Sequence, residues 1–279
     1  MKFGLFDLNK DVCSYAGAAV QVAQAAEAAG FESLWVSEHI ALPDPPIPRF
    51  PVEPETRWIE PLTMLTFLAG QTARIKLGTG VVILPQRNPL ILAKQLASMD
   101  ELSDGRLLFG LGVGHLQPEM EAIGVPFNRR GAMGDEYLAA MHALWHQPQP
   151  AYQGRYVSFS QVQSHPQRDV HLVIGGHSPA AHRRAIKHGR GWYGYSLDLE
   201  ATEQALTGLR AEAQAVDRPA ELGQLEISIS PPRGMVEPEQ VAQYAALGVA
   251  RLILLPPLVA SVDERLKFID EVHDRLIKA

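Results

Sequence analysis

The chain has 279 residues, of which 46% are hydrophobic and 20% are charged, which is typical of a soluble globular protein. A formal net charge of −6 without a basic run argues against nucleic acid or an anionic membrane as a partner. Cys13 is the sole cysteine, so no intrachain disulfide and no cysteine zinc cluster can form. Residues 1–10 do not form a signal peptide, and no apolar run approaches about 18 residues, so we expect a cytoplasmic protein.

Short apolar runs alternate with amphipathic stretches along the whole chain, as expected for repeated parallel βα units. The predicted strands are Lys2–Phe6, Ser33–Val36, Ile75–Val82, Leu107–Leu111, His171–Ile174, Gly191–Tyr195, Glu226–Ser230 and Arg251–Leu255. The predicted helices are Ser14–Ala29, Glu60–Gly70, one that starts at Asn88, Asp135–Trp145, Ser178–Gly189, Leu199–Ala215, Glu237–Gly248 and one that starts at Ser261. Eight strands, each followed by a helix, predict a single-domain (β/α)8 TIM barrel, because doubly wound sheets usually stop at about five to seven strands.

Several of these helices carry recognisable end signals. Asn88-Pro89 and Ser178-Pro179 each provide an N-cap residue followed by proline at the first helical position. Residues 261–264 have the sequence of a capping box at the start of the last helix. These signals agree with the boundaries that the apolar runs suggest.

Two connections are longer than a barrel requires. Six prolines lie from Pro43 to Pro54, so this segment cannot be helical and has few amide donors for a sheet. It follows the second strand, and it is either a stiff surface loop or a wall or lid at the end where barrel enzymes work. Residues 147–168 contain Gly154 between two aromatic runs and predict a small hairpin inserted before the fifth strand. We expect this insertion also to cover the mouth of the barrel.

Barrel active sites lie at the carboxyl ends of the strands, and Glu38 and His39 follow strand two. A histidine there can exchange protons near neutral pH, although a surface or capping role is equally open at this point. Gly78 and Gly80 lie inside the third strand, where glycine indicates a bulge, close approach of a ligand, or tight packing against a helix.

Two glycine turns follow later strands. Gly110, Gly112 and Gly114 precede His115 after strand four, without the spacing of the dinucleotide fingerprint, and would let a flat ligand lie against the backbone. Residues 175–178, Gly-Gly-His-Ser, lead directly into a capped helix, whose exposed amides and dipole would favour a phosphate. Glycine turns also occur in barrels for geometry alone, so both interpretations of residues 175–178 stay open here.

Metal and nucleophilic chemistry find little support. The ten histidines include no H-x-H or H-E-x-x-H motif. Those from residue 165 to 188 are about six positions apart and spread over several elements, and His182 and His188 are polar positions on one helix. No G-x-S-x-G elbow occurs. We therefore expect neither a bound metal nor a covalent nucleophile.

Four segments, in chain order, resemble the luciferase-like monooxygenase family, particularly its coenzyme F420-dependent branch. They are residues 25–39 (AAEAAGFESLWVSEH), 60–114, 124–138 (GVPFNRRGAMGDEYL) and 171–185 (HLVIGGHSPAAHRRA). After Gly191 only the topology is similar. The resemblance implies a phosphate-bearing flavin or deazaflavin that lies across the mouth of the barrel.

The resemblance also implies roles for particular residues. His39 matches a histidine that lies close to the deazaflavin and the substrate in F420-dependent relatives, and Glu38 would tune or position it. Relatives have a non-prolyl cis peptide in the third strand, which here would join Gly80 and Val81. The segment with Gly112, Gly114 and His115 matches a cofactor-lining loop, and the segment with Gly175, Gly176, His177 and Ser178 matches the phosphate loop.

The chain departs from its relatives at two of these places. Arg130 stands where FMN-using relatives have an Arg-Tyr pair, and Gly131 replaces the tyrosine, which argues for F420 over FMN. Relatives often carry an acid or a tryptophan where this chain has His115, so the substrate-activating residue is not carried over.

The resemblance thus implies hydride exchange between F420 and a small organic substrate, with His39 as general acid or base. The alternatives are an FMN-dependent monooxygenase that uses reduced FMN and oxygen, a metal-dependent barrel hydrolase or isomerase, and a non-catalytic flavin- or deazaflavin-binding barrel. Relatives are often dimers, so we expect a homodimer.

Overall fold

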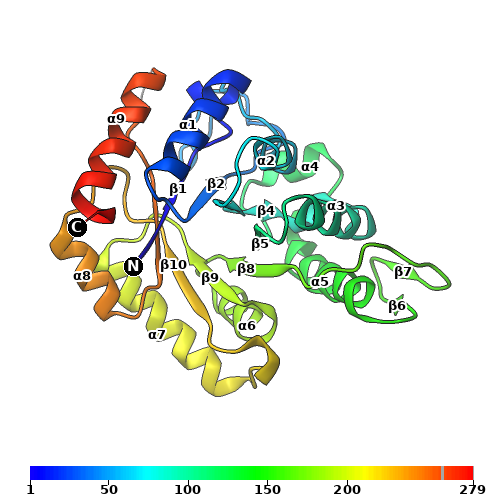
Figure 1. Ribbon diagram of the computed structural model, residues 1–279. Helices are drawn as coiled ribbons and strands as arrows, with labels where there is room; N and C mark the ends of the chain where they lie inside the picture. The colour runs from blue at the N-terminus through cyan, green and yellow to red at the C-terminus, as the bar shows by residue number, and fades with distance from the viewer. Residues whose placement is uncertain (259–260, 279) are drawn as a thin grey trace.

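The computed structural model describes residues 1–258 and 261–278 and has a closed barrel of parallel strands at its centre (Figure 1). In barrel order the strands are β3 (Lys76–Thr79), β2 (Ser33–Val36), β1 (Lys2–Leu5), β11 (Arg251–Leu254), β10 (Glu226–Ile229), β9 (Gly191–Gly194), β8 (His171–Gly175) and β5 (Leu107–Gly112). Pairing between β3 and β5 closes the ring, and β4 (Val82–Ile83) prolongs the third strand beside β5. The predicted (β/α)8 TIM barrel is confirmed.

Helices surround the barrel, as Figure 1 shows. They are α1 (Ala16–Ala28), α2 (Pro61–Ala69), α3 (Pro89–Leu102), α4 (Gln117–Ala122), α5 (Arg130–His146), α6 (Pro179–His188), α7 (Leu199–Ala215), α8 (Pro238–Ala246) and α9 (Val262–Val272). Short turns of other helical types are η1 (Asp11–Ser14), η2 (Leu84–Gln86), η3 (Phe127–Arg129), η4 (Ala220–Leu222) and the π-helical η5 (His273–Ile277). None of the helices among the described residues is both long and apolar enough to cross a membrane.

The expected helix starts are confirmed by side-chain hydrogen bonds. The Asn88 side chain accepts from the amides of Leu90 and Ile91, and Ser178 accepts from the amide of Ala181. Ser261 and Glu264 form the predicted capping box. These bonds satisfy amides that have no acceptor within the helix itself.

The predicted boundaries differ from the structure most clearly at four points. The expected strand Ile75–Val82 is interrupted at Gly80 and Val81, so that β3 and β4 are separate. The first helix begins at Ala16, because Asp11–Ser14 forms its own turn and Tyr15 is extended. The short helix α4 was not predicted, and α5 begins at Arg130, ahead of the expected Asp135.

The inserted hairpin is confirmed, and its Tyr156 packs against the cluster of Ile83, Met120, Val125 and Met133; that it covers the mouth stays a prediction. Its strands, β6 (Tyr152–Gln153) and β7 (Ser158–Phe159), pair antiparallel. The amides of residues 155–157 bind the Glu136 carboxylate on α5, and Lys94 on α3 binds the carbonyl of His165. Figure 1 shows β6 and β7 on the outer side of α5. The segment leaves the end of α5 and returns along that helix, so its tip reaches Glu136 in the first half of α5.

The amino-terminal end of the barrel is closed by a buried arginine. Arg251, at the start of β11, is 1% exposed and donates to Glu32 at 2.8 and 2.9 Å, to Ser228 at 2.9 Å and to Glu226. These acceptors precede β2 or lie in β10, so one guanidinium joins three parts of the sheet. Removing one partner of such a buried pair leaves an uncompensated charge.

Replacement of this arginine should therefore weaken the fold strongly. Arg251→Met should lower the free energy of unfolding by about 3–5 kcal/mol, because the carboxylates of Glu32 and Glu226 lose their buried partner. Their remaining ion-pair partners, Lys76 and Lys2, have partly exposed side chains. The matched control is Arg275→Met, whose pair with Glu237 is exposed on both sides and should matter by less than about 1 kcal/mol. Urea unfolding of the two variants measures both values, and equal losses would contradict the role given to Arg251.

The same region should make stability depend on pH. Burial lowers the pKa of His171 to about 4, and, against an opposing effect of burial, Arg251 and Lys2 lower the pKa of Glu226 to about 2. Both values lie below the ordinary pKa values of 6.5 for histidine and 4.5 for glutamate. Each group therefore contributes its full stabilisation above its ordinary pKa and loses it as the pH falls towards its lowered pKa. Each group should cost up to roughly 3 kcal/mol of unfolding free energy, first His171 and then Glu226. Urea unfolding at stepped pH should show His171→Gln with a flatter slope below about pH 6.5, whereas exposed His165→Gln keeps the original slope.

Candidate active site

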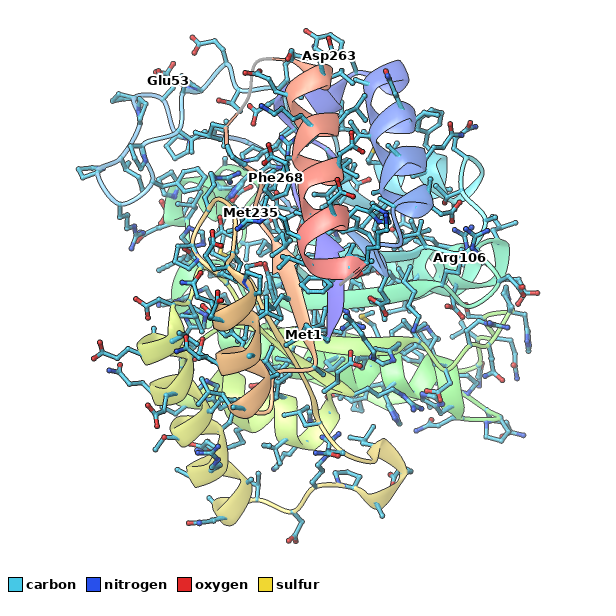
Figure 2. The ribbon with its side chains drawn as sticks, turned by 60° about the vertical axis from the view of Figure 1, so that its left-hand side comes forward. Met1, Glu53, Arg106, Met235, Asp263 and Phe268 are labelled. Carbon is cyan, nitrogen blue, oxygen red and sulfur yellow. The ribbon has the colours of Figure 1, made fainter. Side chains whose placement is uncertain are left out.

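The expected site residues follow the carboxyl ends of different strands, which meet at one end of a parallel barrel. His39 follows β2, Gly80 and Val81 lie between β3 and β4, His115 follows β5, and residues 176–178 follow β8. In Figure 2, Glu53 of the proline-rich segment and Asp263 of α9 lie at one end of the molecule, away from Met1 at the start of β1. We call this end the mouth.

His39 sits in an aromatic enclosure at the mouth. Its ring centroid is 4.6 Å from that of Phe50 and 4.8 Å, edge to face, from that of Trp58. The His115 ring is 6.2 Å away, and the side chain of His39 is 10% exposed. Phe50 belongs to the proline-rich segment, so that segment forms a wall of the site, one of the two roles considered for it.

The carboxylate that contacts His39 comes from Glu119 on α4, which the sequence analysis did not single out. Glu119 Oε2 is 3.2 Å from His39 Nδ1, and Oε1 accepts from the amide of Ile40 at 2.6 Å. The Glu119 side chain is 3% exposed. The available signal was Gln117-Pro118-Glu119, which places proline and an acid in the first turn of a helix.

Glu38 does not position His39 in this way, so the expected pairing needs correction. Glu38 and His39 are adjacent in the chain but contact different elements. The buried Glu38 carboxylate accepts from the amide of Ile83 in β4 and pairs with Arg87, which also binds Glu60 at 2.7 Å. Burial raises the pKa of Glu38, while the charge of Arg87 acts in the opposite direction. Glu38 thus supports β4 by binding its backbone at Ile83.

The third strand carries the cis peptide that the resemblance implied, between Gly80 and Val81. The amide of Gly80 still bonds to Val36 of β2 at 2.7 Å. A Cβ at Gly112 or Gly175 would lie 2.8 or 2.7 Å from a Cγ atom of Val81. These two glycines therefore leave room for Val81, which is a packing role in addition to the cofactor-lining role expected for them.

Aromatic rings support this part of the third strand. Val81 is partly buried against a cluster that contains Phe6 and Tyr193. A Cβ at Gly80 would lie 2.6 Å from the Phe6 ring. Gly80 and Val81 keep partial exposure, so they present a backbone surface at the mouth against which a flat ring can lie.

Arg130 supports the glycine loop after β5. Its Nε donates to the carbonyl of Gly114 at 3.0 Å, and its guanidinium lies 3.8 Å from the Phe127 ring centroid. Gly114 has φ of +81°, a conformation that favours glycine. Exposed His115 is held through its carbonyl by Arg49 at 3.0 Å, and its pKa is lowered by burial of part of the ring and by the neighbouring His39 and Arg49.

The loop after β8 has the features of an anion site. Gly176 has φ of +115°, and exposed residues 176–178 lead into the ten-residue helix α6. His177 Nε2 accepts from the amide of Tyr195 at 3.2 Å. Across the part of the chain that the structure describes, the amides of His177 and Ser178 donate to no protein acceptor. Free amides at a helix start fit a phosphate group.

Comparison with known proteins decides the family. The family model described as luciferase-like monooxygenase matches residues 1–274. The chain belongs to this family. An uncharacterized protein of Mycobacterium tuberculosis is 28% identical over 271 residues, which cover 91% of this chain and 92% of that protein.

Two further known proteins are similar to this chain. An F420-dependent glucose-6-phosphate dehydrogenase of Kineococcus radiotolerans is 28% identical over 202 residues, 69% of this chain and 57% of that enzyme. The structure of an F420-dependent secondary alcohol dehydrogenase in complex with an F420–acetone adduct superposes with a TM-score of 0.78 at 15% identity, covering 97% of each chain. At that identity the superposition shows the shared barrel fold.

The packing of Val81 between two glycines can be tested by compensation. Gly175→Ala should lower the free energy of unfolding by about 1–3 kcal/mol, because its Cβ would meet Val81 at 2.7 Å. Adding Val81→Ala, which removes both Cγ atoms, should recover part of that loss in denaturant unfolding. Gly131→Ala on α5, where a Cβ meets nothing within 4 Å, is the control and should not destabilise. Additive losses in the double variant would contradict the contact.

Proposed function

We propose that this luciferase-like protein is an F420-dependent oxidoreductase that exchanges a hydride with a small organic substrate. The observation that carries the proposal is His39, which is enclosed by Phe50 and Trp58 at the mouth. It lies in the loop after β2, the strand that pairs with β3. A related protein named as an F420-dependent dehydrogenase supports the choice of cofactor.

The protein groups would hold the cofactor at two places. Gly80 and Val81, supported by Phe6 and Tyr193, would seat the flat ring system. The free amides at the start of α6 would bind its phosphate. When bound, the deazaflavin supplies the hydride donor or acceptor, and the chain supplies orientation and proton handling.

His39 would manage the proton that accompanies the hydride. In the oxidative direction it takes a proton from the substrate as the substrate loses a hydride, and in the reductive direction it returns that proton. Phe50 and Trp58 keep water from two sides of the imidazole ring. Exclusion of water at this position strengthens the interaction of the imidazole with a developing charge on the substrate.

Cofactor binding tests the proposal and the phosphate loop together. Fluorescence quenching should show F420 binding that is tighter than FMN binding. Ser178→Asp retains a good N-cap residue but adds a negative charge where the phosphate would bind, so it should raise the F420 dissociation constant about tenfold or more. Asn88→Asp makes the same change at the start of α3, away from this loop, and should leave the dissociation constant unchanged.

The outcomes separate the candidate functions. Micromolar binding of FMN with none of F420 would overturn the proposal in favour of an FMN-dependent monooxygenase. Binding of F420 without turnover across a panel of alcohols, aldehydes and enones would indicate a cofactor-binding barrel without this activity. If Ser178→Asp and Asn88→Asp change the F420 dissociation constant equally, the loop before α6 is not the phosphate site.

A further inference from the structure

We propose that Glu119 is a positioning residue that fixes the tautomer of His39, with the proton on Nδ1 and the free electron pair on Nε2. The proposal deepens the function above, because it states which nitrogen of His39 would exchange protons with the substrate. It concerns contacts within the chain, so it can be examined without cofactor or substrate.

The first step is the contact between the two side chains. Glu119 Oε2 lies 3.2 Å from His39 Nδ1, and the carboxylate is 3% exposed. A carboxylate accepts hydrogen bonds and donates none, so the imidazole nitrogen must be the donor. In neutral imidazole one nitrogen donates and the other accepts. Donation by Nδ1 therefore leaves Nε2 as the acceptor.

The second step is the other carboxylate oxygen. Glu119 Oε1 accepts from the amide of Ile40 at 2.6 Å, and a backbone amide can only donate. The same carboxylate thus binds the side chain of residue 39 and the backbone of residue 40. This double contact fixes both the position of the loop and the rotation of the imidazole ring, so the tautomer is imposed by two hydrogen bonds that share one group.

The third step is the direction of the open nitrogen. His39 Nε2 has no protein partner among the residues that the structure describes, and it is absent from the buried side-chain nitrogens that lack one. Nε2 therefore keeps some exposure, on a ring that lies beside Phe50 and Trp58 at the mouth. With Nδ1 held by Glu119, Nε2 can take a proton, and the buried carboxylate stabilises the imidazolium that forms, as the carboxylate does in a Ser-His-Asp triad.

The sharpest variant is Glu119→Gln, because an amide has one acceptor oxygen where the carboxylate has two. The Ile40 amide can only donate, so it retains the amide oxygen, and the NH₂ group then faces His39 Nδ1. That group would donate to Nδ1 and reverse the tautomer. Glu121→Gln is the matched control, since Glu121 is exposed on the same helix and its side chain accepts from Gln117 at 2.7 Å, with no contact to His39 among the residues that the structure describes.

Long-range proton–nitrogen correlation spectra of protein labelled with 15N-histidine report the tautomer directly. The His39 signals are identified as those lost in His39→Asn. We expect an Nδ1-protonated neutral ring in the unaltered chain and in Glu121→Gln, and an Nε2-protonated ring in Glu119→Gln. An Nε2-protonated ring in the unaltered chain would overturn the proposal, whether or not any variant folds.

Activity gives a second, separate measurement once a substrate is found. Glu119→Gln should lower kcat by about 100-fold or more, within the range for loss of a positioned acid or base, while the F420 dissociation constant stays within about twofold. Glu121→Gln should leave both unchanged. A Glu119→Gln variant with unchanged kcat would overturn the proposal, whereas failure of the unaltered chain to bind F420 would count against the proposed function and leave the tautomer spectrum valid.

Discussion

The structure of the mouth depends on the point where the third barrel strand, β3 continued by β4, stops pairing with β2. β3 pairs with β2 on one side and with β5 on the other, but β4, beyond Gly80 and Val81, continues only beside β5. The β2 side of β4 would then have an amide without a ladder partner. The Glu38 carboxylate fills this position by accepting from the amide of Ile83. A buried amide without an acceptor is costly. The carboxylate of Glu38, just after β2, therefore allows β4 to leave the side of β2.

His39 lies directly beside that support. Glu38 contacts Ile83 of β4, whereas the next side chain, His39, packs with Phe50 and Trp58 at the mouth. Asn9 fixes the residue before this pair, since its side chain donates to the carbonyl of Ser37 at 2.7 Å and accepts from its amide at 3.2 Å. Trp58, which packs on His39, also donates to that carbonyl. The residues that support the interrupted strand and the imidazole are thus adjacent in the chain, from Ser37 to His39.

The sequence patterns were sufficient for the barrel because most strands contain a short apolar run that is buried on both faces and bounded by turn residues. They also located the rim residues, since the end of a strand fixes the end of the barrel. Glu119 escaped notice because its partner His39 is 80 positions away in the chain, and no local periodicity encodes such a contact. The role of Glu38 was misassigned for the same reason, because its partner Ile83 lies on a strand whose interruption is a tertiary feature.

The proline-rich segment shows how part of the site is built before any ligand binds. Proline lowers the conformational freedom of the unfolded chain, so ordering this segment costs less entropy than ordering a flexible loop of equal length. Arg49 ties it to the carbonyl of His115, and Phe50 packs on the rings of both His39 and His115. One wall of the mouth is therefore held by the chain itself. Binding of a substrate against His39 would not have to order that wall, and preorganisation of this kind leaves more of the binding free energy for orienting the reacting groups.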